Sequence, residues 1–359
     1  MGTAKTPVLW TTGAPGTGKS TTGWGLYTRV AALGGSVAYV DIDQLGLIGP
    51  PPGGGEHAHA IKAGNLLRVL DILRRRGVRQ IVVSGVVDPE NGTEPYFEGR
   101  DEGFELTLVR LRCDRDELRS RFLGRGSLAE ALPDLFTVAD DYDRTGFGEL
   151  LDTSGQLPEE TVEALLSRCV VAGGPVHPLP DVEPRPGHVI VVTGPTAAGK
   201  STAAWSVLRD LWQREVPVAY VDLAQLAFVR PGPDPAVEAA NLAAVWRGYR
   251  DAGARTLLIA AREFGRGHSR AFGEVTVVHL DADAATLAER VRRRAGGESA
   301  LLAGDELRGA SPDVRDRVTA RAVAEAEEMR RSPGDRVVLD TSGQEPAETA
   351  AALLSVVGQ

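Results

Sequence analysis

The sequence predicts an α/β protein with two tandem domains, each a parallel five-stranded sheet with helices on both faces. Short apolar runs alternate with segments of helical length, which is the pattern of parallel strands connected by helices. AYVD occurs at 38–41 and again at 219–222, and LDTSGQ occurs at 151–156 and 339–344. These repeats lie far more than 50 residues apart, so they indicate a duplicated domain and not a solenoid.

Apolar runs bounded by turn residues predict the elements of the first copy. Helices are expected where apolar positions recur at helical spacing, and strands where short runs are continuously apolar. In chain order we expect a strand at 7–12, a helix from about 19 to 33, a strand at 36–41, a helix from about 56 to 76, strands at 80–86 and 106–111, a helix at 115–125, a final strand, and a helix at 158–170.

The two copies are separated by a proline-rich stretch. Residues 171–187 hold five prolines and show no periodic apolar face, so we expect a semi-extended linker. The predicted domains are therefore 1–170 and 188–359. A chain of 359 residues is long enough for two separate cores.

Composition excludes several classes of function. The net charge of −9 argues against a protein that grips nucleic acid electrostatically. No apolar run is long enough to predict a membrane span. Two cysteines provide neither a disulfide framework nor a metal cluster, so we expect a cytoplasmic setting.

Each copy carries a phosphate-binding loop after its first strand. GAPGTGKS at 13–20 and GPTAAGKS at 194–201 both fit G-x-x-x-x-G-K-[ST]. Backbone N–H groups of such a loop surround a β-phosphate, the lysine neutralises the β/γ oxygens, and the hydroxyl is placed to ligate Mg²⁺. The predicted nucleotide-binding residues in the loops are Gly13, Gly16, Gly18, Lys19, Ser20, Thr21, Gly194, Gly199, Lys200, Ser201 and Thr202.

Two carboxylates stand at the end of the second predicted strand. Asp41 and Asp43 are two residues apart, so both side chains are expected on one face. One can help to hold Mg²⁺, and the other can orient an acceptor hydroxyl and take its proton. We predict metal ligation by Ser20 and Asp41 in the first copy, and by Ser201 and Asp222 in the second.

The first copy resembles the adenylyl-sulfate kinase, gluconate kinase and shikimate kinase group of P-loop kinases. VDIDQLGL resembles the LDGDN-x-R segment of adenylyl-sulfate kinase, and the helix with its following strand, KAGNLLRVLDILRRRGVRQIVVSGVVDP, resembles that family's ENIRR helix. The resemblance spans most of 7–165 and recurs more weakly at 188–355. The family's FS-x-x-R segment is absent, and GPPPGGGEHAH at 49–59 stands there instead. The acceptor is therefore left open among sugars, nucleosides, adenylyl sulfate and antibiotic-like hydroxyls.

The resemblance implies two kinase-like domains and suggests residue roles. Asp43 would be the acceptor-side carboxylate, and Asn65 would lie on the substrate-side helix. Lys62, the only lysine outside the two loops and the N-terminal segment, could contact an anionic acceptor.

Further residues resemble the lid of nucleoside-monophosphate-kinase-like enzymes and the adenine-side loop of the kinase group. Arg121 and Arg125 are four residues apart and resemble the R-x-x-x-R lid whose arginines neutralise the transferring phosphoryl group. In this kinase group the loop matching DTSGQ runs beside the adenine. Thr153 and Gly155 are therefore predicted to approach the nucleotide, although the same loop also fits a helix-capping turn.

The second copy departs from the first at the acceptor side. VDLAQL keeps Asp222 but places Ala224 where Asp43 stands in the first copy. Arg262 and Glu263 enter the tip of the third strand, and a charged helical run at 311–332 has been added. We expect this copy to bind nucleotide with an acceptor site that has been rebuilt or abandoned.

The leading hypothesis is an ATP- and Mg²⁺-dependent kinase acting on a small-molecule hydroxyl, with Lys19, Asp43, Arg121 and Arg125 as catalytic residues. One alternative is a nucleotide-binding switch whose two copies pack as a pseudo-dimer. Another is polynucleotide-kinase-like end processing, against which the acidic balance argues.

Overall fold

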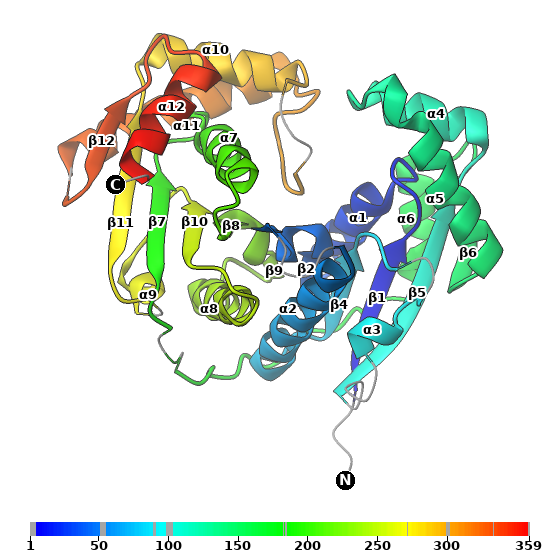
Figure 1. Ribbon diagram of the computed structural model, residues 1–359. Coiled ribbons are helices and arrows are strands. Elements are labelled where there is room, and N and C mark those ends of the chain that lie inside the picture. Colours follow the sequence, from blue (N-terminus) through cyan, green and yellow to red (C-terminus); the bar gives the residue numbers. More distant parts are fainter. Residues whose placement is uncertain are drawn as a thin grey trace. The chain divides into compact units, whose positions relative to one another are not determined.

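The computed structural model describes residues 5–50, 55–88, 91–97, 103–181, 183, 185–270, 272–298, 302–332 and 334–357 (Figure 1). The chain divides into two compact units whose segments interleave along the sequence. The first unit comprises Met1–Gly46, Gly55–Pro180 and Gln225–Val245, and the second comprises Leu47–Gly54, Asp181–Ala224 and Trp246–Gln359.

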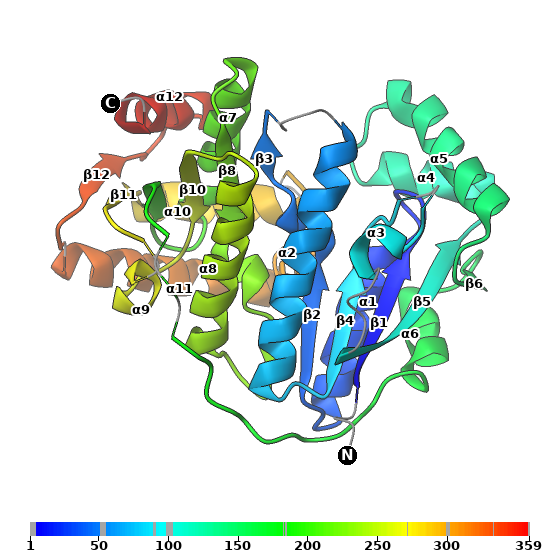
Figure 2. The ribbon, with the colours of Figure 1, turned by 60° about the horizontal axis from the view of Figure 1, so that its bottom comes forward.

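The first unit follows the predicted alternation of strands and helices. Its sheet has the order β6-β5-β1-β4-β2-β9, and the first five of these strands are parallel. Figure 2 shows α2 on one face of this sheet and α1 with α6 on the other. The elements are β1 (Thr6–Thr12), α1 (Lys19–Ala32), β2 (Val37–Asp41), the 3₁₀ helix η1 (Ile42–Leu45), α2 (Gly55–Arg76), β4 (Gln80–Ser84), α3 (Glu94–Phe97), β5 (Phe104–Arg112), α4 (Arg115–Gly124), η3 (Ala129–Ala131), α5 (Leu132–Thr145), β6 (Glu149–Asp152) and α6 (Pro158–Leu166).

The second unit repeats this strand order as β12-β11-β7-β10-β8-β3. The helix α8 (Pro235–Asp251) begins in a segment of the first unit and ends in the second. The other elements are β3 (Ile48–Gly49), β7 (His188–Thr193), α7 (Lys200–Gln213), β8 (Val218–Asp222), η4 (Leu223–Leu226), β10 (Thr256–Ala260), α9 (Arg266–Ser269), β11 (Val275–Asp281), α10 (Ala284–Ala295), α11 (Pro312–Arg331), β12 (Val337–Asp340) and α12 (Pro346–Val357).

Each sheet has six strands, so the prediction of five was wrong. The additional strands are β9 (Val229–Arg230), which pairs antiparallel with β2, and β3, which pairs antiparallel with β8. Without them β2 and β8 would be open sheet edges with unpaired N–H and C=O groups. Tyr39 donates its backbone N–H to the Phe228 carbonyl at 3.0 Å, and Tyr220 donates to Leu47 at 2.8 Å. Strands of two residues carry no periodicity, so sequence patterns did not reveal them.

Central strands are buried on both faces, as expected for a parallel sheet covered by helices. In β1, Val8, Leu9 and Trp10 are all buried, and the Trp10 indole donates to the Gly85 carbonyl at 3.2 Å. This rigid centre places the carboxyl ends of the parallel strands, where sites of such folds lie. Within the described part of the chain, no helix has the length and apolarity required to cross a membrane.

Phe228 completes an aromatic cluster in the first unit. Its ring centroid lies 4.8 Å from that of Trp24 and 5.9 Å from that of Tyr39. We expect Phe228→Ala to destabilise the first unit by roughly 2 kcal/mol, because the half-buried ring loses its packing. Hydrogen exchange should then quicken in peptides from β2. Faster exchange confined to the second unit would contradict this assignment of Phe228.

Candidate functional site

The first phosphate-binding loop connects β1 to α1 in the first unit. Gly13 has φ +135°, and a Cβ there would lie 2.3 Å from the Leu111 carbonyl oxygen, so only glycine fits. Gly18 caps α1 in the left-handed region at φ +96°. Ser20 and Thr21 are exposed on the first turn of the helix. The loop motif therefore has a structural cause for its glycines and leaves its helix-side hydroxyls accessible.

Lys19 is buried at the centre of this loop. Its Nζ donates to the Ala14 carbonyl at 2.9 Å. Burial lowers the pKa of Lys19 to about 8; Asp43 and Asp41 act in the opposite direction, and the positive charge of Arg125 lowers the pKa further. Three residues predicted from the sequence therefore lie close enough to affect the loop lysine.

The two aspartates at the tip of β2 have different surroundings. The Asp41 carboxylate accepts the Asp43 backbone N–H at 3.0 Å and so caps η1. Burial, followed by the charge of Asp43, raises the pKa of Asp41 to about 6. Asp43 is half exposed, and its Oδ1 accepts from Lys62 Nζ at 2.7 Å. An inner carboxylate and an outer, lysine-paired carboxylate suit a metal site and an acceptor site respectively.

Asn65 supports the fold of this turn. Its side chain is fully buried, and Nδ2 donates to the Leu45 carbonyl at 2.8 Å. Asn241 makes the same bond to Leu226 at 2.8 Å. The sequence-based prediction that Asn65 contacts substrate is therefore corrected: its amide holds η1 in place behind Asp43.

Arg121 is bonded to the DTSGQ loop. Its guanidinium donates to the Thr153 hydroxyl at 3.2 Å and to the Thr153 carbonyl at 3.0 Å, and it is paired with Glu117 at 2.5 Å. These bonds hold it against the DTSGQ loop, and its action on the transferring phosphoryl group stays a prediction. Arg125 is exposed at the end of α4 and remains the arginine that affects Lys19.

The DTSGQ loop is itself tightly organised. Asp152 accepts from the backbone N–H of Ser154 at 2.9 Å and from its hydroxyl at 2.6 Å. Gly155 adopts φ +66° and donates its N–H to Glu117 at 2.9 Å. The buried Thr153 hydroxyl donates to the Arg112 carbonyl at 3.0 Å. The loop is thus a preformed turn at the end of β6, joined to α4 through Glu117.

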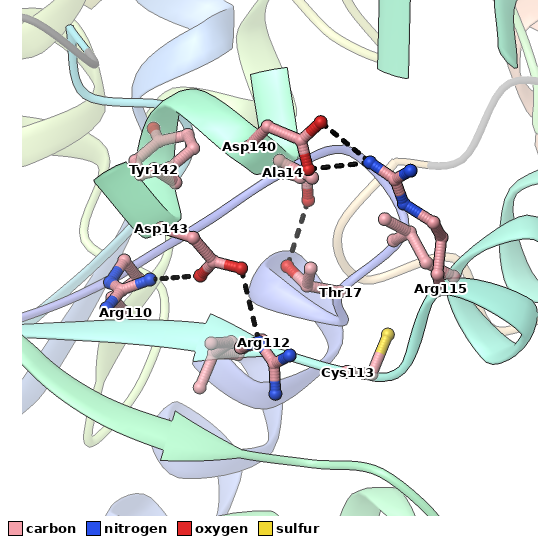
Figure 3. A pocket seen from close by; sticks show the side chains of 12 residues that line it. Ala14, Thr17, Arg110, Arg112, Cys113, Arg115, Asp140, Tyr142 and Asp143 are labelled. Carbon is pink, nitrogen blue, oxygen red and sulfur yellow. Dashed lines mark hydrogen bonds and ion pairs between the residues drawn. The ribbon is translucent and has the colours of Figure 1, made fainter. Parts of the chain in front are cut away.

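Sequence reasoning missed a cavity beside the first loop. This cavity of about 140 Å³ is lined by Ala14 and Thr17 of the loop and by residues of β5 and α5. Figure 3 shows the ion pairs that join α5 to β5 and to Arg115, the first residue of α4. Arg110 pairs with Asp143 at 2.7 Å, and Arg115 pairs with Asp140 at 2.6 Å. The alternating arginines 110 and 112 of β5 were the available signal, but the sequence analysis did not anticipate α5.

The second unit has a similar loop, in which a serine hydroxyl lies beside an aspartate carboxylate. Lys200 Nζ donates to the carbonyls of Gly194 at 2.9 Å and Pro195 at 2.8 Å, and burial lowers its pKa to about 8. The Ser201 hydroxyl donates to Asp222 Oδ2 at 2.8 Å. Burial raises the pKa of Asp222. The predicted metal ligands of this copy are therefore adjacent in space.

A cavity of about 350 Å³ opens beside the second loop. Arg290 lines it and donates to the Ala198 carbonyl at 2.9 Å and to the Thr341 hydroxyl at 3.0 Å, as Arg121 donates to the Thr153 hydroxyl in the first unit. Trp205 and Gln344 also line the cavity. Its volume and mixed lining fit a nucleotide-sized ligand.

One feature of the second unit had no counterpart in the sequence-based prediction. Glu325 of α11 accepts the backbone N–H of Thr196, a loop residue, at 2.7 Å. Arg262, which stands at the tip of β10, lies 3.4 Å from the same carboxylate. In the second unit, a carboxylate from α11 therefore contacts the phosphate-binding loop itself.

Scans of family models and of curated proteins find no match to this chain. Among solved structures, kinases with nucleotide-kinase-like P-loop folds are similar to parts of it. A sugar kinase from Janibacter sp. is 15% identical, covering 46% of this chain and 94% of that one, with a TM-score of 0.34. A gluconokinase from Sinorhizobium meliloti is 17% identical, covering 49% and 94%, with a TM-score of 0.32. The tunicamycin resistance protein of Deinococcus radiodurans is 15% identical, covering 45% and 95%, with a TM-score of 0.36.

Proposed function

We propose that the first unit transfers the γ-phosphoryl group of ATP to a hydroxyl of a small-molecule acceptor. The observation that carries this proposal is the grouping of Lys19 with two carboxylates of unequal environment, Asp41 inside and Asp43 outside. A loop that only binds nucleotide has no need for an outer carboxylate paired with a lysine. Phosphoryl transfer to a hydroxyl needs a group that accepts the proton.

The residues present fit ATP and Mg²⁺. Mg²⁺ is usually held by one or two carboxylates together with substrate phosphates, and groups of three metal-ligating side chains are absent from the described residues. Ser20 and Asp41 would hold the ion in the first unit, and Ser201 with Asp222 in the second. The bound ion would supply positive charge at the β/γ oxygens.

Each residue of the first site has a separate role in the proposed transfer. The loop N–H groups bind the β-phosphate, and the buried Lys19 ammonium faces the phosphoryl group as it moves. Asp43 orients the acceptor hydroxyl and takes its proton. Lys62 holds the Asp43 carboxylate in place at 2.7 Å and presents a positive charge to the acceptor. Arg125 adds a further positive charge on the side of α4.

The proposal is tested by incubating the protein with γ-labelled ATP, Mg²⁺ and pools of sugars, nucleosides and other hydroxyl compounds. Label recovered in an organic product supports phosphoryl transfer. Label recovered only as inorganic phosphate would instead support the alternative of a nucleotide-hydrolysing switch. Label on oligonucleotide ends would support the end-processing alternative.

Activity should depend on pH through two groups of the free enzyme. Asp41 has a raised pKa of about 6, so its metal-holding carboxylate is lost as pH falls through 6. Lys19 has a lowered pKa of about 8, so its charge is lost as pH rises through 8. We therefore expect kcat/KM for ATP to be bell-shaped with limbs near these values. A rate that stays constant as pH falls through 6 would contradict the role of Asp41.

A further inference from the structure

Glu325 accepts a hydrogen bond from the backbone of the second phosphate-binding loop. Its Oε2 accepts the Thr196 N–H at 2.7 Å, and its side chain is only 16% exposed. Backbone N–H groups of such loops ordinarily face the phosphates of a nucleotide. A carboxylate is therefore bonded directly to the second phosphate-binding loop, at Thr196.

Positive charges surround this carboxylate. Arg262 lies 3.4 Å and Arg321 lies 4.0 Å from Glu325 Oε1. Glu325 is also close enough to Lys200 to raise the pKa of that lysine against the effect of burial. The lysine of a phosphate-binding loop reaches the β- and γ-phosphates. Glu325 thus places a negative charge of the protein itself close to Lys200, the residue that would reach the nucleotide's β- and γ-phosphates.

The first loop has no backbone N–H at the equivalent position and cannot make this hydrogen bond. The residue at the position of Thr196 is Pro15, and proline has no backbone N–H to donate. The two loops therefore differ in the donor itself as well as in the acceptor-side residue, Asp43 against Ala224.

The remainder of the second site is open. The 350 Å³ cavity is lined by loop residues from Ala197 to Ala203, with Trp205 and Arg290, whereas Thr196 and Glu325 are not among its described lining residues. Trp205 is 38% exposed, so one face of an aromatic side chain is accessible to a base. The cavity thus provides room for a base and phosphates along residues 197–203, and Glu325 is bonded to the loop at Thr196, directly before this stretch.

We propose that the second unit is a binding site for nucleoside diphosphates that discriminates against triphosphates, with Glu325 repelling the γ-phosphate. The inference rests on the nucleotide-binding part of the proposed function. A like charge held this close to the position of the γ-phosphate opposes triphosphate binding in a partly buried site. ADP is also the product that the first unit would release, so this site would respond to the progress of that reaction.

The test uses the full chain with Lys19→Ala, so that the first loop is weakened and the second dominates binding. Titration calorimetry with Mg·ADP and Mg·ATP should show ADP binding tighter by at least about tenfold. Glu325→Gln in the same background should remove most of this preference by strengthening ATP binding. Glu328→Gln, on the exposed side of α11, is the matched control and should keep the preference.

Three outcomes would overturn the inference. ATP binding as tightly as ADP in the Lys19→Ala protein would do so, as would a Glu325→Gln variant that weakens both nucleotides equally. Nucleotide binding abolished by Lys19→Ala alone would show that the second loop is not a nucleotide site. Glu325→Ala, checked by thermal unfolding, distinguishes loss of discrimination from loss of folding. The ratio of affinities is measured without an acceptor, so failure to find a phosphorylated product leaves this test intact.

Discussion

Replacement of Asp43 by asparagine is expected to slow phosphoryl transfer by ~10²–10⁴-fold, the usual cost of losing a general base. Affinity for Mg·ATP should change little, because Asp43 is half exposed and paired with Lys62 on the acceptor side. Asparagine keeps the size of the side chain and its hydrogen-bonding reach but cannot take a proton. Single-turnover rates with γ-labelled ATP, together with ATP affinity measured by titration, separate the two effects.

The matched control for this prediction is Asp71→Asn on α2. Asp71 pairs with Arg74 at 2.7 Å and Arg75 at 2.6 Å, on the same helix as Lys62 but away from Lys19. This variant should retain transfer. If Asp43→Asn weakens Mg·ATP binding strongly while turnover per bound ATP is unchanged, Asp43 is a metal-site residue and its assigned role is wrong.

Lys19→Ala is expected to abolish detectable transfer to the acceptor, whereas Lys200→Ala should retain most of it. Lys19 is a buried cation close to Asp43, and in the proposed reaction it would face the phosphoryl group; alanine removes this charge without a substitute. The second copy has Ala224 where Asp43 stands in the first, so it lacks the carboxylate to which we assign the acceptor role. The measurement is labelled acceptor per enzyme, not release of ADP, because ADP release would also report hydrolysis.

Thermal unfolding with and without ADP provides the control for this pair. Binding to the folded state alone stabilises by about 2.7 kcal/mol at a hundredfold excess over Kd. The Lys19→Ala protein should still be stabilised through the second loop, which shows that loss of transfer is not loss of folding. Equal loss of product in the two variants, or greater loss in Lys200→Ala, would count against catalysis by the first unit.

Local patterns were sufficient to predict that charged side chains gather at the tip of β2. The loop motif identified Lys19, and the spacing of two placed Asp41 and Asp43 on one side of a strand end. Both inferences use only a few consecutive residues, and the structure brings these side chains close enough to affect one another.

Patterns did not reveal the hydrogen-bond partners that folding brings to a side chain. Asn65 and Arg121 carry the polar groups expected at a site, but their partners, Leu45 and Thr153, are backbone or loop atoms brought to them by folding. A buried amide or guanidinium must find a hydrogen-bond partner, and the nearest one decides its role.

The sequence by itself determined the alternation of strands and helices, both phosphate-binding loop motifs, and the replacement of Asp43 by Ala224 in the second copy. Tertiary structure alone decided the sixth strand of each sheet and the contact of Glu325 with Thr196. Periodicity and motifs report neighbours along the chain. The edge strands β2 and β8 pair with residues more than a hundred positions away, and so does the Thr196 N–H. No local pattern specifies such partners.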